Sequence, residues 1–273
     1  MQRVFITGAS SGLGQALAVQ YARDGALVAL VGRRRAQLEL LQASLPNPSQ
    51  HRVYALDVND HAALAAAAAD FIAAYDGIDV VIANAGISQG TLTELREDLP
   101  VFERIVATNL TATVATFAPF IAAMKQQRDA RRPTFPPRLV AIASVAGIRG
   151  LPGASAYSAS KAAVISYCES LRVELRGSGI KVVTLVPGYI DTPMTQSNAY
   201  PMPFLMPAER FAEQALRAIE AGSSYRVIPW QMGVVAKLLR LLPNPVYDWA
   251  FARAPHKARA GAERASGAPP SQA

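Results

Sequence analysis

The sequence predicts an α/β fold of three layers, in which helices cover both faces of a doubly wound parallel sheet of about seven strands. Two observations carry this prediction. Short, nearly continuous apolar runs alternate with longer segments of helical pattern, as expected for strands buried on both faces of a parallel sheet. The length of 273 residues and the hydrophobic content of 51% suit one such domain better than two small ones.

The elements follow in chain order. Six apolar runs are assigned to strands: 4–6, 26–31, 53–56, 80–83, 139–143 and 182–186. Helical patterns between them cover four stretches: 12–23, 61–75, 100–125 and 155–176. Repeated β-α-β units imply right-handed crossovers, so ligands are expected beyond the carboxyl ends of the strands. We expect one domain over 1–254, a surface loop over 126–137 and a disordered tail over 255–273.

Composition disfavours several classes of protein for this chain. A single cysteine, Cys168, excludes a disulfide framework and fits a reducing compartment. No signal-peptide pattern and no uncharged apolar run of membrane-spanning length is visible, so a cytoplasmic location is expected. The net charge of +7 comes without aromatic interleaving or a recognition motif, which disfavours nucleic acid. His51, His61 and His256 lack metal-ligand spacing, so no metal is expected.

A glycine-rich turn, T-G-A-S-S-G-L-G, follows the first strand and opens a helix. Gly8 permits a tight turn, Gly12 lets a diphosphate approach the backbone, and Gly14 permits close packing of the helix on the sheet. The helix N-terminus adds free N–H groups and a partial positive charge. The candidate diphosphate site therefore comprises Gly8, Ser10, Ser11, Gly12, Leu13 and Gly14. The alternative is a Gly/Ser turn that binds no ligand.

Tyr157 and Lys161 are candidates for proton transfer. They are four residues apart at the start of a helical pattern, so both lie on one face of that helix. A free tyrosine titrates near about 10, and a nearby ammonium brings its proton transfer closer to neutral pH. Ser144 ends the fifth strand at the ligand-binding edge of the sheet, where it can hold a substrate oxygen. Taken alone, Y-x-x-x-K also fits a chance surface pair.

The glycine spacing T-G-x-x-x-G-x-G resembles that of the short-chain dehydrogenase/reductase family, and six motifs match that family in order over most of 3–195. The resemblance implies a Rossmann-like fold, a nicotinamide cofactor, and Tyr157 and Lys161 beside that cofactor. Asn109 stands where the family has its fourth catalytic residue, which organises a water that links Lys161 to solvent. The alternative for Asn109 is a buried asparagine that caps or kinks its helix.

The end of the second strand bears on the choice of cofactor. Gly32 stands where an NAD-preferring relative usually carries Asp, and Arg33 and Arg34 follow it. The missing carboxylate and the guanidinium of Arg33, assisted by Arg34, favour a 2′-phosphate, so NADP(H) is expected over NAD(H). Some NADP-preferring relatives carry a basic residue where this chain has Ser11. The alternative is an exposed basic turn at a helix start.

The resemblance assigns three further stretches to the cofactor, each after a strand. The stretch after the third strand holds the adenine, and small residues after the fourth let the chain pass close to the cofactor. The loop after the sixth holds the nicotinamide carboxamide through the Ile190 backbone and the Thr192 hydroxyl. The residues are Asp57, Val58, Asn84, Ala85, Gly86, Pro187, Gly188, Ile190 and Thr192.

Two apolar segments follow the sixth strand. The stretch 194–206 contains three methionines with Tyr200, Phe204 and Leu205, and is expected to be a lid over a hydrophobic substrate. The alternative is an ordinary loop buried against the sheet. The stretch 230–252 is apolar with basic residues interspersed, and Pro243 interrupts its helix. It is interpreted as a flap over the pocket, a subunit contact, or a segment that makes weak contact with a membrane surface.

These observations predict an NADP(H)-dependent oxidoreductase that interconverts a carbonyl and a primary or secondary alcohol on a small hydrophobic substrate. The resemblance also implies a homodimer or homotetramer. The alternative is a non-catalytic NADP-sensing or scaffold protein on the same fold, but such proteins often lose the Tyr or the Lys, and this chain has both. A nucleotide-sugar epimerase is disfavoured by the glycine spacing and by the short segment after the sixth strand.

Overall fold

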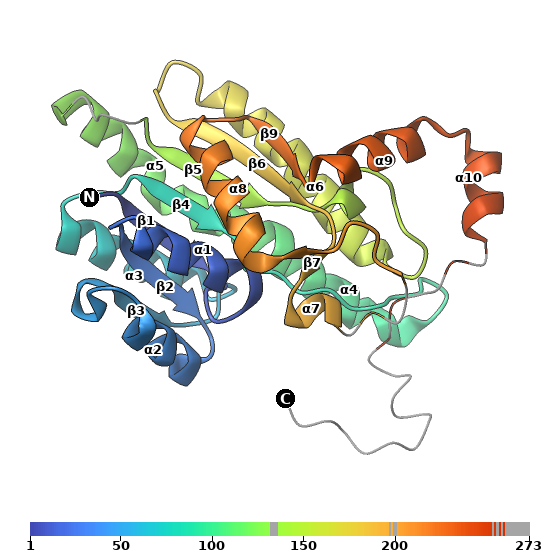
Figure 1. Cartoon of the computed structure of the whole chain (residues 1–273), viewed down its shortest axis with the longest axis horizontal. Coiled ribbons are helices and arrows are strands. Elements are labelled where there is room, and N and C mark those ends of the chain that lie inside the picture. Colours follow the sequence, from blue (N-terminus) through green and yellow to red (C-terminus); the bar gives the residue numbers. More distant parts are fainter. Residues whose placement is uncertain are drawn as a thin grey trace.

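Seven parallel strands form the central sheet, which confirms the predicted fold class (Figure 1). The computed structural model describes residues 1–131, 136–196, 198, 201–252, 254, 257 and 259, with side chains up to 127 in the first range. The strand order is β3-β2-β1-β4-β5-β6-β9. The bounds are β1 Arg3–Thr7, β2 Leu27–Gly32, β3 Arg52–Ala55, β4 Val80–Ala83, β5 Arg138–Ile142, β6 Lys181–Pro187 and β9 Tyr225–Ile228. The order reverses beside β1, which is where such sheets bind ligands.

Helices cover both faces of this sheet. The longer ones are α1 Gly12–Arg23, α2 Arg35–Ser44, α3 His61–Tyr75, α4 Leu99–Val106, α5 Ala112–Arg131, α6 Ser155–Glu174, α8 Ala208–Glu220, α9 Trp230–Leu241 and α10 Asn244–Phe251. Short 3-10 turns lie at Pro48–Gln50, Arg96–Asp98 and Val145–Gly147. The layers confirm the three-layer prediction.

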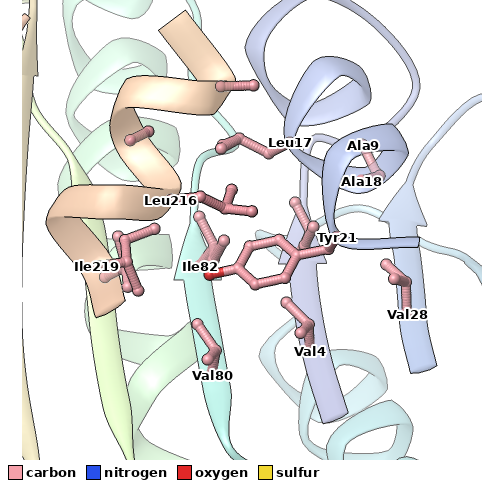
Figure 2. Close-up of a cluster of buried hydrophobic side chains, with 14 of the residues drawn as sticks. Val4, Ala9, Leu17, Ala18, Tyr21, Val28, Val80, Ile82, Leu216 and Ile219 are labelled. Carbon is pink, nitrogen blue, oxygen red and sulfur yellow. The ribbon is translucent and has the colours of Figure 1, made fainter. Parts of the chain in front are cut away.

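Alternate residues of each strand enter two separate cores. Val4 of β1 packs with α1, α2 and α8 on one face, whereas Phe5 packs with α3, α5 and α6 on the other. Figure 2 shows the first core, where Leu17 and Tyr21 of α1 lie over Val4 and Ile82. Because both faces of every central strand are covered, no position on it favours a polar side chain, and this explains the continuous apolar runs.

The helix expected over 100–125 is both interrupted and longer than expected. A π-helical turn, Ala107–Thr111, separates α4 from α5, and α5 continues through Arg131. The surface loop expected from residue 126 therefore starts later, and residues 132–135 of it lie outside the described residues. The π turn contains Asn109, whose side chain is discussed below.

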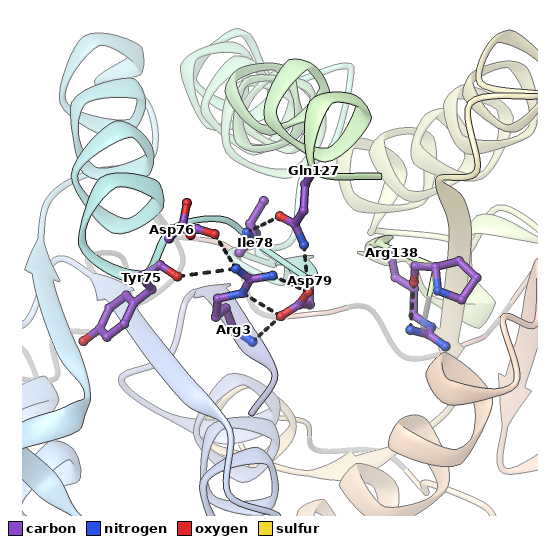
Figure 3. A network of polar contacts seen from close by, with 8 residues as sticks. Arg3, Tyr75, Asp76, Ile78, Asp79, Gln127 and Arg138 are labelled. Atoms are coloured by element: carbon purple, nitrogen blue, oxygen red, sulfur yellow. Dashed lines mark hydrogen bonds and ion pairs between the residues drawn. The ribbon is translucent and has the colours of Figure 1, made fainter. Parts of the chain in front are cut away.

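A polar network explains why α5 extends past residue 125 (Figure 3). The Gln127 side chain accepts a hydrogen bond from the backbone of Ile78 (2.9 Å) and donates one to Asp79 (3.1 Å). Asp79 also accepts two side-chain hydrogen bonds from Arg3, both at 2.8 Å. The last turns of α5 are thus tied to the amino ends of β1 and β4.

One helical stretch, Arg96–Gln127, is long and apolar enough to cross a membrane by length and composition alone. In this fold it is a core helix, because Phe117, Phe120 and Met124 are fully buried against the sheet. Its length and apolarity therefore reflect packing in a three-layer domain.

The segment after β6 begins with a small second sheet. β7 (Ile190–Asp191) pairs in parallel with β8 (Met206–Pro207), and the short helix α7 (Pro193–Gln196) lies between them. Of the expected lid over 194–206, residues 197, 199 and 200 lie outside the described residues, and Tyr200 is among them. Met206 is buried, whereas Phe204 and Leu205 are about half exposed.

The C-terminal helices lie at the carboxyl end of β9 (Figure 1). Gly233 of α9 packs against Val227 of β9, and Pro243 separates α9 from α10, as expected. The hydroxyl of Tyr247 on α10 donates to the carbonyl of Gly150 (2.5 Å), and the Arg149 guanidinium lies 4.2 Å from the centre of the Tyr247 ring. The segment 230–252 therefore contacts the loop after β5.

Two described residues of the expected tail contact the loop after β4. Lys257 donates to the Ser88 hydroxyl (2.9 Å), and Arg259 pairs with the buried carboxylate of Asp98 (2.8 Å). The pKa of Asp98 is lowered, chiefly by its hydrogen bond with Arg259. The remainder of the predicted disordered tail over 255–273 lies outside the described residues.

Candidate active site

The glycine-rich turn after β1 has a backbone that requires its glycines. Gly8 and Gly12 adopt φ of 70° and 56°, which side chains other than glycine rarely tolerate. A Cβ at Gly14 would overlap the carbonyl oxygen of Gly8. The Leu13 side chain packs against the core, so this residue can offer a ligand only its backbone. The turn is thus a backbone cradle at the start of α1.

The N-terminus of α1 is suited to an anion. Ser11 occupies the N-cap position, but its hydroxyl makes no capping hydrogen bond. It instead accepts a hydrogen bond from Arg34 (2.7 Å), which also donates to the Ser10 hydroxyl (2.9 Å). Uncapped N–H groups and a guanidinium therefore face the same turn, an arrangement that fits the phosphate groups of a dinucleotide.

The two arginines after β2 point to different partners. Arg34 reaches the glycine turn, whereas Arg33 is 71% exposed and lies 4.0 Å from the Asp57 carboxylate. Asp57 also accepts hydrogen bonds from the backbone and side chain of Asn59 (both 2.9 Å), and Val58 is buried. From the sequence, Arg33 was expected to be the main ligand of the 2′-phosphate, with Arg34 in support. The structure brings Arg34 closer to the phosphate cradle.

The loop after β4 joins the glycine turn to the candidate catalytic residues. The Asn84 side chain donates to the carbonyls of Thr7 (2.9 Å) and Gly8 (3.2 Å), and the Ala85 backbone donates to the Thr7 hydroxyl (3.2 Å). A Cβ at Gly86 would lie 3.2 Å from Asn109 Oδ1 and 3.6 Å from Lys161 Nζ. Thr7 was missed by the sequence reasoning, although it precedes the turn directly.

Ser144, Tyr157 and Lys161 meet at the carboxyl edge of the sheet. Ser144 follows β5, and its hydroxyl accepts a hydrogen bond from the backbone of Ala146 (3.2 Å). Tyr157 and Lys161 lie one turn apart on α6, with Lys161 Nζ 5.8 Å from the centre of the Tyr157 ring. The Ser144 side chain also hydrogen bonds to that of Tyr157. The spacing read from the sequence therefore corresponds to one compact group.

Burial dominates the electrostatics of this group. It raises the pKa of Tyr157, and the hydrogen bond from Ser144 opposes that rise in part. Burial also lowers the pKa of Lys161 to about 8. Lys161 Nζ donates to the carbonyl oxygen of Ile142 (2.7 Å) and lies one helical turn from Tyr157.

Asn109 is fully buried in the π-helical turn between α4 and α5. Its side chain accepts from the Ile87 backbone N–H (2.8 Å) and donates to the Ile87 carbonyl (3.0 Å) and to the Ser160 hydroxyl (3.0 Å). π turns are rare and occur often at functional sites. Asn109 therefore connects the loop after β4 to α6 beside Lys161. Ser160, which carries no recognisable sequence signal, was missed.

The loop after β6 packs against the glycine turn. Pro187 ends β6, and the Gly188 N–H donates to the Ile228 carbonyl (2.8 Å). The Ile190 side chain is buried, which leaves only its backbone for a ligand. A Cβ at Gly12 would lie 3.3 Å from the Thr192 side chain. The loop thus places Thr192 beside the cradle.

A cavity of about 320 Å³ lies between the stretch before α8, α8 itself and the start of α9, lined by Phe204, Leu205, Arg210 and Trp230 among others. None of the candidate catalytic residues lines it. Within the described parts of the chain, no group of three or more His, Cys, Asp or Glu side chains is placed to hold a metal ion.

Comparison with known proteins agrees with this geometry. The family model for short chain dehydrogenases matches residues 2–201. An uncharacterised oxidoreductase of Myxococcus xanthus is 38% identical over 250 residues, which cover 91% of this chain and 95% of that protein. 11-beta-hydroxysteroid dehydrogenase 1A of Arabidopsis thaliana is 32% identical over 80% of this chain, and the match spans 60% of that protein.

The solved structure of a 3-ketoacyl-(acyl-carrier-protein) reductase from Brucella melitensis, complexed with NADH, superposes with a TM-score of 0.75. It is 26% identical, and the match covers 83% of this chain and 96% of the reductase. Family model, relatives and sheet topology all agree. The chain belongs to the short-chain dehydrogenase/reductase family, whose members are NAD(P)-dependent oxidoreductases.

Proposed function

We propose that this chain is an NADP(H)-dependent oxidoreductase that interconverts a carbonyl and a primary or secondary alcohol on a small hydrophobic substrate. The observation that carries the proposal is the grouping of Ser144, Tyr157 and Lys161 at the carboxyl edge of the sheet, next to Gly86 and the phosphate cradle. Two hydroxyls and one ammonium there suit a reacting oxygen that must gain or lose a proton.

When bound, a nicotinamide cofactor supplies or accepts the hydride. In the reductive direction, the hydroxyls of Ser144 and Tyr157 hold the carbonyl oxygen, and Tyr157 donates its proton to that oxygen. The raised pKa of Tyr157 keeps the phenol protonated at neutral pH, so the proton to be donated is present on the hydroxyl. Lys161, with a pKa near 8, is able to exchange a proton close to neutral pH. Asn109 positions α6 through Ser160.

Tyr157→Phe tests this role. The variant should lose most turnover in the reduction of a panel of ketones and aldehydes, yet bind NADPH nearly as the wild type does. Tyr167→Phe on the same helix α6 is a matched control and should retain turnover. Full activity of Tyr157→Phe would refute the assignment. NADPH binding by the wild-type protein without turnover of any panel member would favour a non-catalytic sensor.

The proposed preference for NADP(H) rests on the absence of an acidic side chain at Gly32 and on two nearby guanidinium groups. Arg34 is already directed at Ser10 and Ser11, and Arg33 is exposed beside Asp57. A charge-assisted hydrogen bond contributes about 1.5–3 kcal/mol, so Arg34→Ala or Arg33→Asp should lower kcat/KM for NADPH by about tenfold or more.

Arg33→Asp should change kcat/KM for NADH much less than that for NADPH. Arg34→Ala should lower kcat/KM for both cofactors, because Arg34 faces the cradle for the diphosphate that both carry. Arg35→Ala is the matched control, because Arg35 pairs only with Glu39 on the surface of α2 among the described residues (3.4 Å). Wild-type enzyme that uses NADH as efficiently as NADPH would contradict the cofactor proposal. The NADH in the related reductase structure makes this comparison necessary.

The proposal includes a hydrophobic substrate, a homodimer or homotetramer and a cytoplasmic location. The apolar side chains of the lid and the hydroxysteroid named for a relative support the substrate class. A screen of apolar ketones and aldehydes for NADPH consumption tests the substrate class. Sedimentation equilibrium tests the oligomeric state, and fractionation of the source cells tests the location.

A further inference from the structure

Helix α9 has apolar side chains on two different faces. Met232, Gly233 and Ala236 are buried against the rest of the domain. Four other apolar residues are exposed and recur at intervals of four, four and three residues: Trp230, Val234, Leu238 and Leu241. A surface helix of a globular domain needs only one apolar stripe, which faces the core. Among the described residues, the second stripe therefore has no role in packing.

The exposed apolar surface continues on α10. Val246 and Trp249 are exposed there, and α10 projects with α9 at the end of the molecule opposite α2 (Figure 1). We call the six exposed residues of these helices the α9–α10 face: Trp230, Val234, Leu238, Leu241, Val246 and Trp249. The half-exposed Phe204 and Leu205 of the lid adjoin Trp230, since all three line one cavity. Scattered single apolar residues need no explanation, but a gathered group does.

The charges on α9 and α10 favour an anionic lipid surface over a second copy of this chain as the partner of this face. Lys237 and Arg240 on α9 are exposed beside the apolar stripe, and Asp248 is the single acidic residue between 230 and 251. A second copy packed through the same face would bring another pair of these cations with one carboxylate to offset them. Anionic lipid headgroups instead offer one negative charge to each cation. Tryptophan, with a large apolar ring and one N–H, favours such an interface.

We propose that the α9–α10 face docks this protein on an anionic lipid surface, as a peripheral contact. The apolar stripe enters the headgroup boundary, while Lys237 and Arg240 stay with the phosphates. This inference is independent of the proposed reaction. In the docked orientation the half-exposed lid residues lie next to the lipid.

The chain provides its own probe for this proposal. Its only two tryptophans, Trp230 and Trp249, are 68% and 84% exposed, and both belong to the α9–α10 face. Full-length protein is mixed with vesicles of phosphatidylcholine, with or without phosphatidylglycerol, and floated on a density gradient. We expect flotation with the anionic vesicles, a blue shift of tryptophan emission, and quenching by brominated lipid. Trp249→Phe leaves Trp230 as sole reporter and should show the same shift.

Substitutions can separate the apolar contribution to vesicle binding from the electrostatic one. Leu238→Ser with Leu241→Ser should weaken vesicle binding by about tenfold or more. Lys237→Gln and Arg240→Gln should each weaken vesicle binding by about fivefold. Added salt should weaken the binding of the wild type as well. Leu40→Ser on α2 is the matched control, because Leu40 is 72% exposed at the other end of the domain and should bind as wild type does.

Three results would overturn the proposal. The first is absence of flotation and of a spectral shift with anionic vesicles. The second is an equal loss of binding in Leu40→Ser, which would remove the link to this face. The third is a blue shift that grows with protein concentration in the absence of lipid, which would assign the face to a second copy of the chain. None of these readouts uses turnover or NADPH, so their failure leaves the proposed reaction untouched.

Discussion

Replacing Lys161 with methionine should stabilise the protein while abolishing its activity. Lys161 is 4% exposed, and burial lowers its pKa from 10.5 to about 8. At about 1.4 kcal/mol for each tenfold change in proton affinity, this shift means that the buried charge costs about 3 kcal/mol. Methionine has a similar length and no charge, but it loses the hydrogen bond to the Ile142 carbonyl, worth about 1 kcal/mol. The net gain in the free energy of unfolding should be about 2 kcal/mol at neutral pH.

The pH dependence of the stability difference between Lys161→Met and wild type shows whether the buried charge is its cause. Below about pH 8 the lysine is protonated in both the folded and the unfolded states, so the wild type bears the full cost of the buried charge. Between about 8 and 10.5 the unfolded lysine still binds the proton that the folded one has released, so wild-type stability rises with pH. Methionine does not titrate. The advantage of the variant should therefore be complete below that window and shrink through it. Above the window it should turn into a deficit of about 1 kcal/mol, because the lost hydrogen bond to the Ile142 carbonyl is then uncompensated.

Urea denaturation of the ligand-free protein at several pH values measures both quantities. Lys181→Met is the matched control, because Lys181 is exposed at the start of β6 and its removal should change stability little at any pH. The difference between variant and wild type cancels the titration of all other groups. A variant less stable than wild type at neutral pH, or an advantage that does not shrink between about 8 and 10.5, would refute the reasoning.

Three further predictions follow from single contacts. Gly14→Ala should abolish NADPH binding in a fluorescence titration, because the added methyl overlaps the Gly8 carbonyl; binding within twofold of wild type would contradict this. Arg138→Met should lower the free energy of unfolding by about 2–4 kcal/mol with unchanged kcat, because the buried guanidinium binds the last carbonyls of α8. Asp98→Asn should speed tryptic cleavage near Arg259, which this carboxylate holds; an unchanged rate would count against that contact.

The sequence alone determined the features that depend on local chemistry or on burial. Continuous apolar runs predicted a parallel sheet, because strands covered on both faces have no polar side. The glycine turn was recognisable because no other residue fits its backbone, as the positive φ of Gly8 and Gly12 shows. Tyr157 and Lys161 could be placed on one face of α6, because a helix alone brings residues four apart together.

Contacts between distant segments were decided only by the tertiary structure. Arg33 and Arg34 are adjacent in sequence, yet only Arg34 reaches Ser10 and Ser11, because the start of α2 directs the two side chains apart. The seventh strand, β9, is short and half exposed, so its apolar pattern is too weak to detect. Asn109 bonds to Ile87, 22 residues away, through a π turn that no local pattern predicts.

The second apolar face of α9 illustrates the same limit. The sequence shows that Trp230, Met232 and Leu238 are all apolar. It does not show which of them are buried in the fold. The tertiary structure places Met232 against Gly188 in the loop after β6, where it is buried, and leaves Trp230 and Leu238 in solvent. Local patterns record which residues avoid water. Which of these residues are buried depends on where the rest of the chain packs.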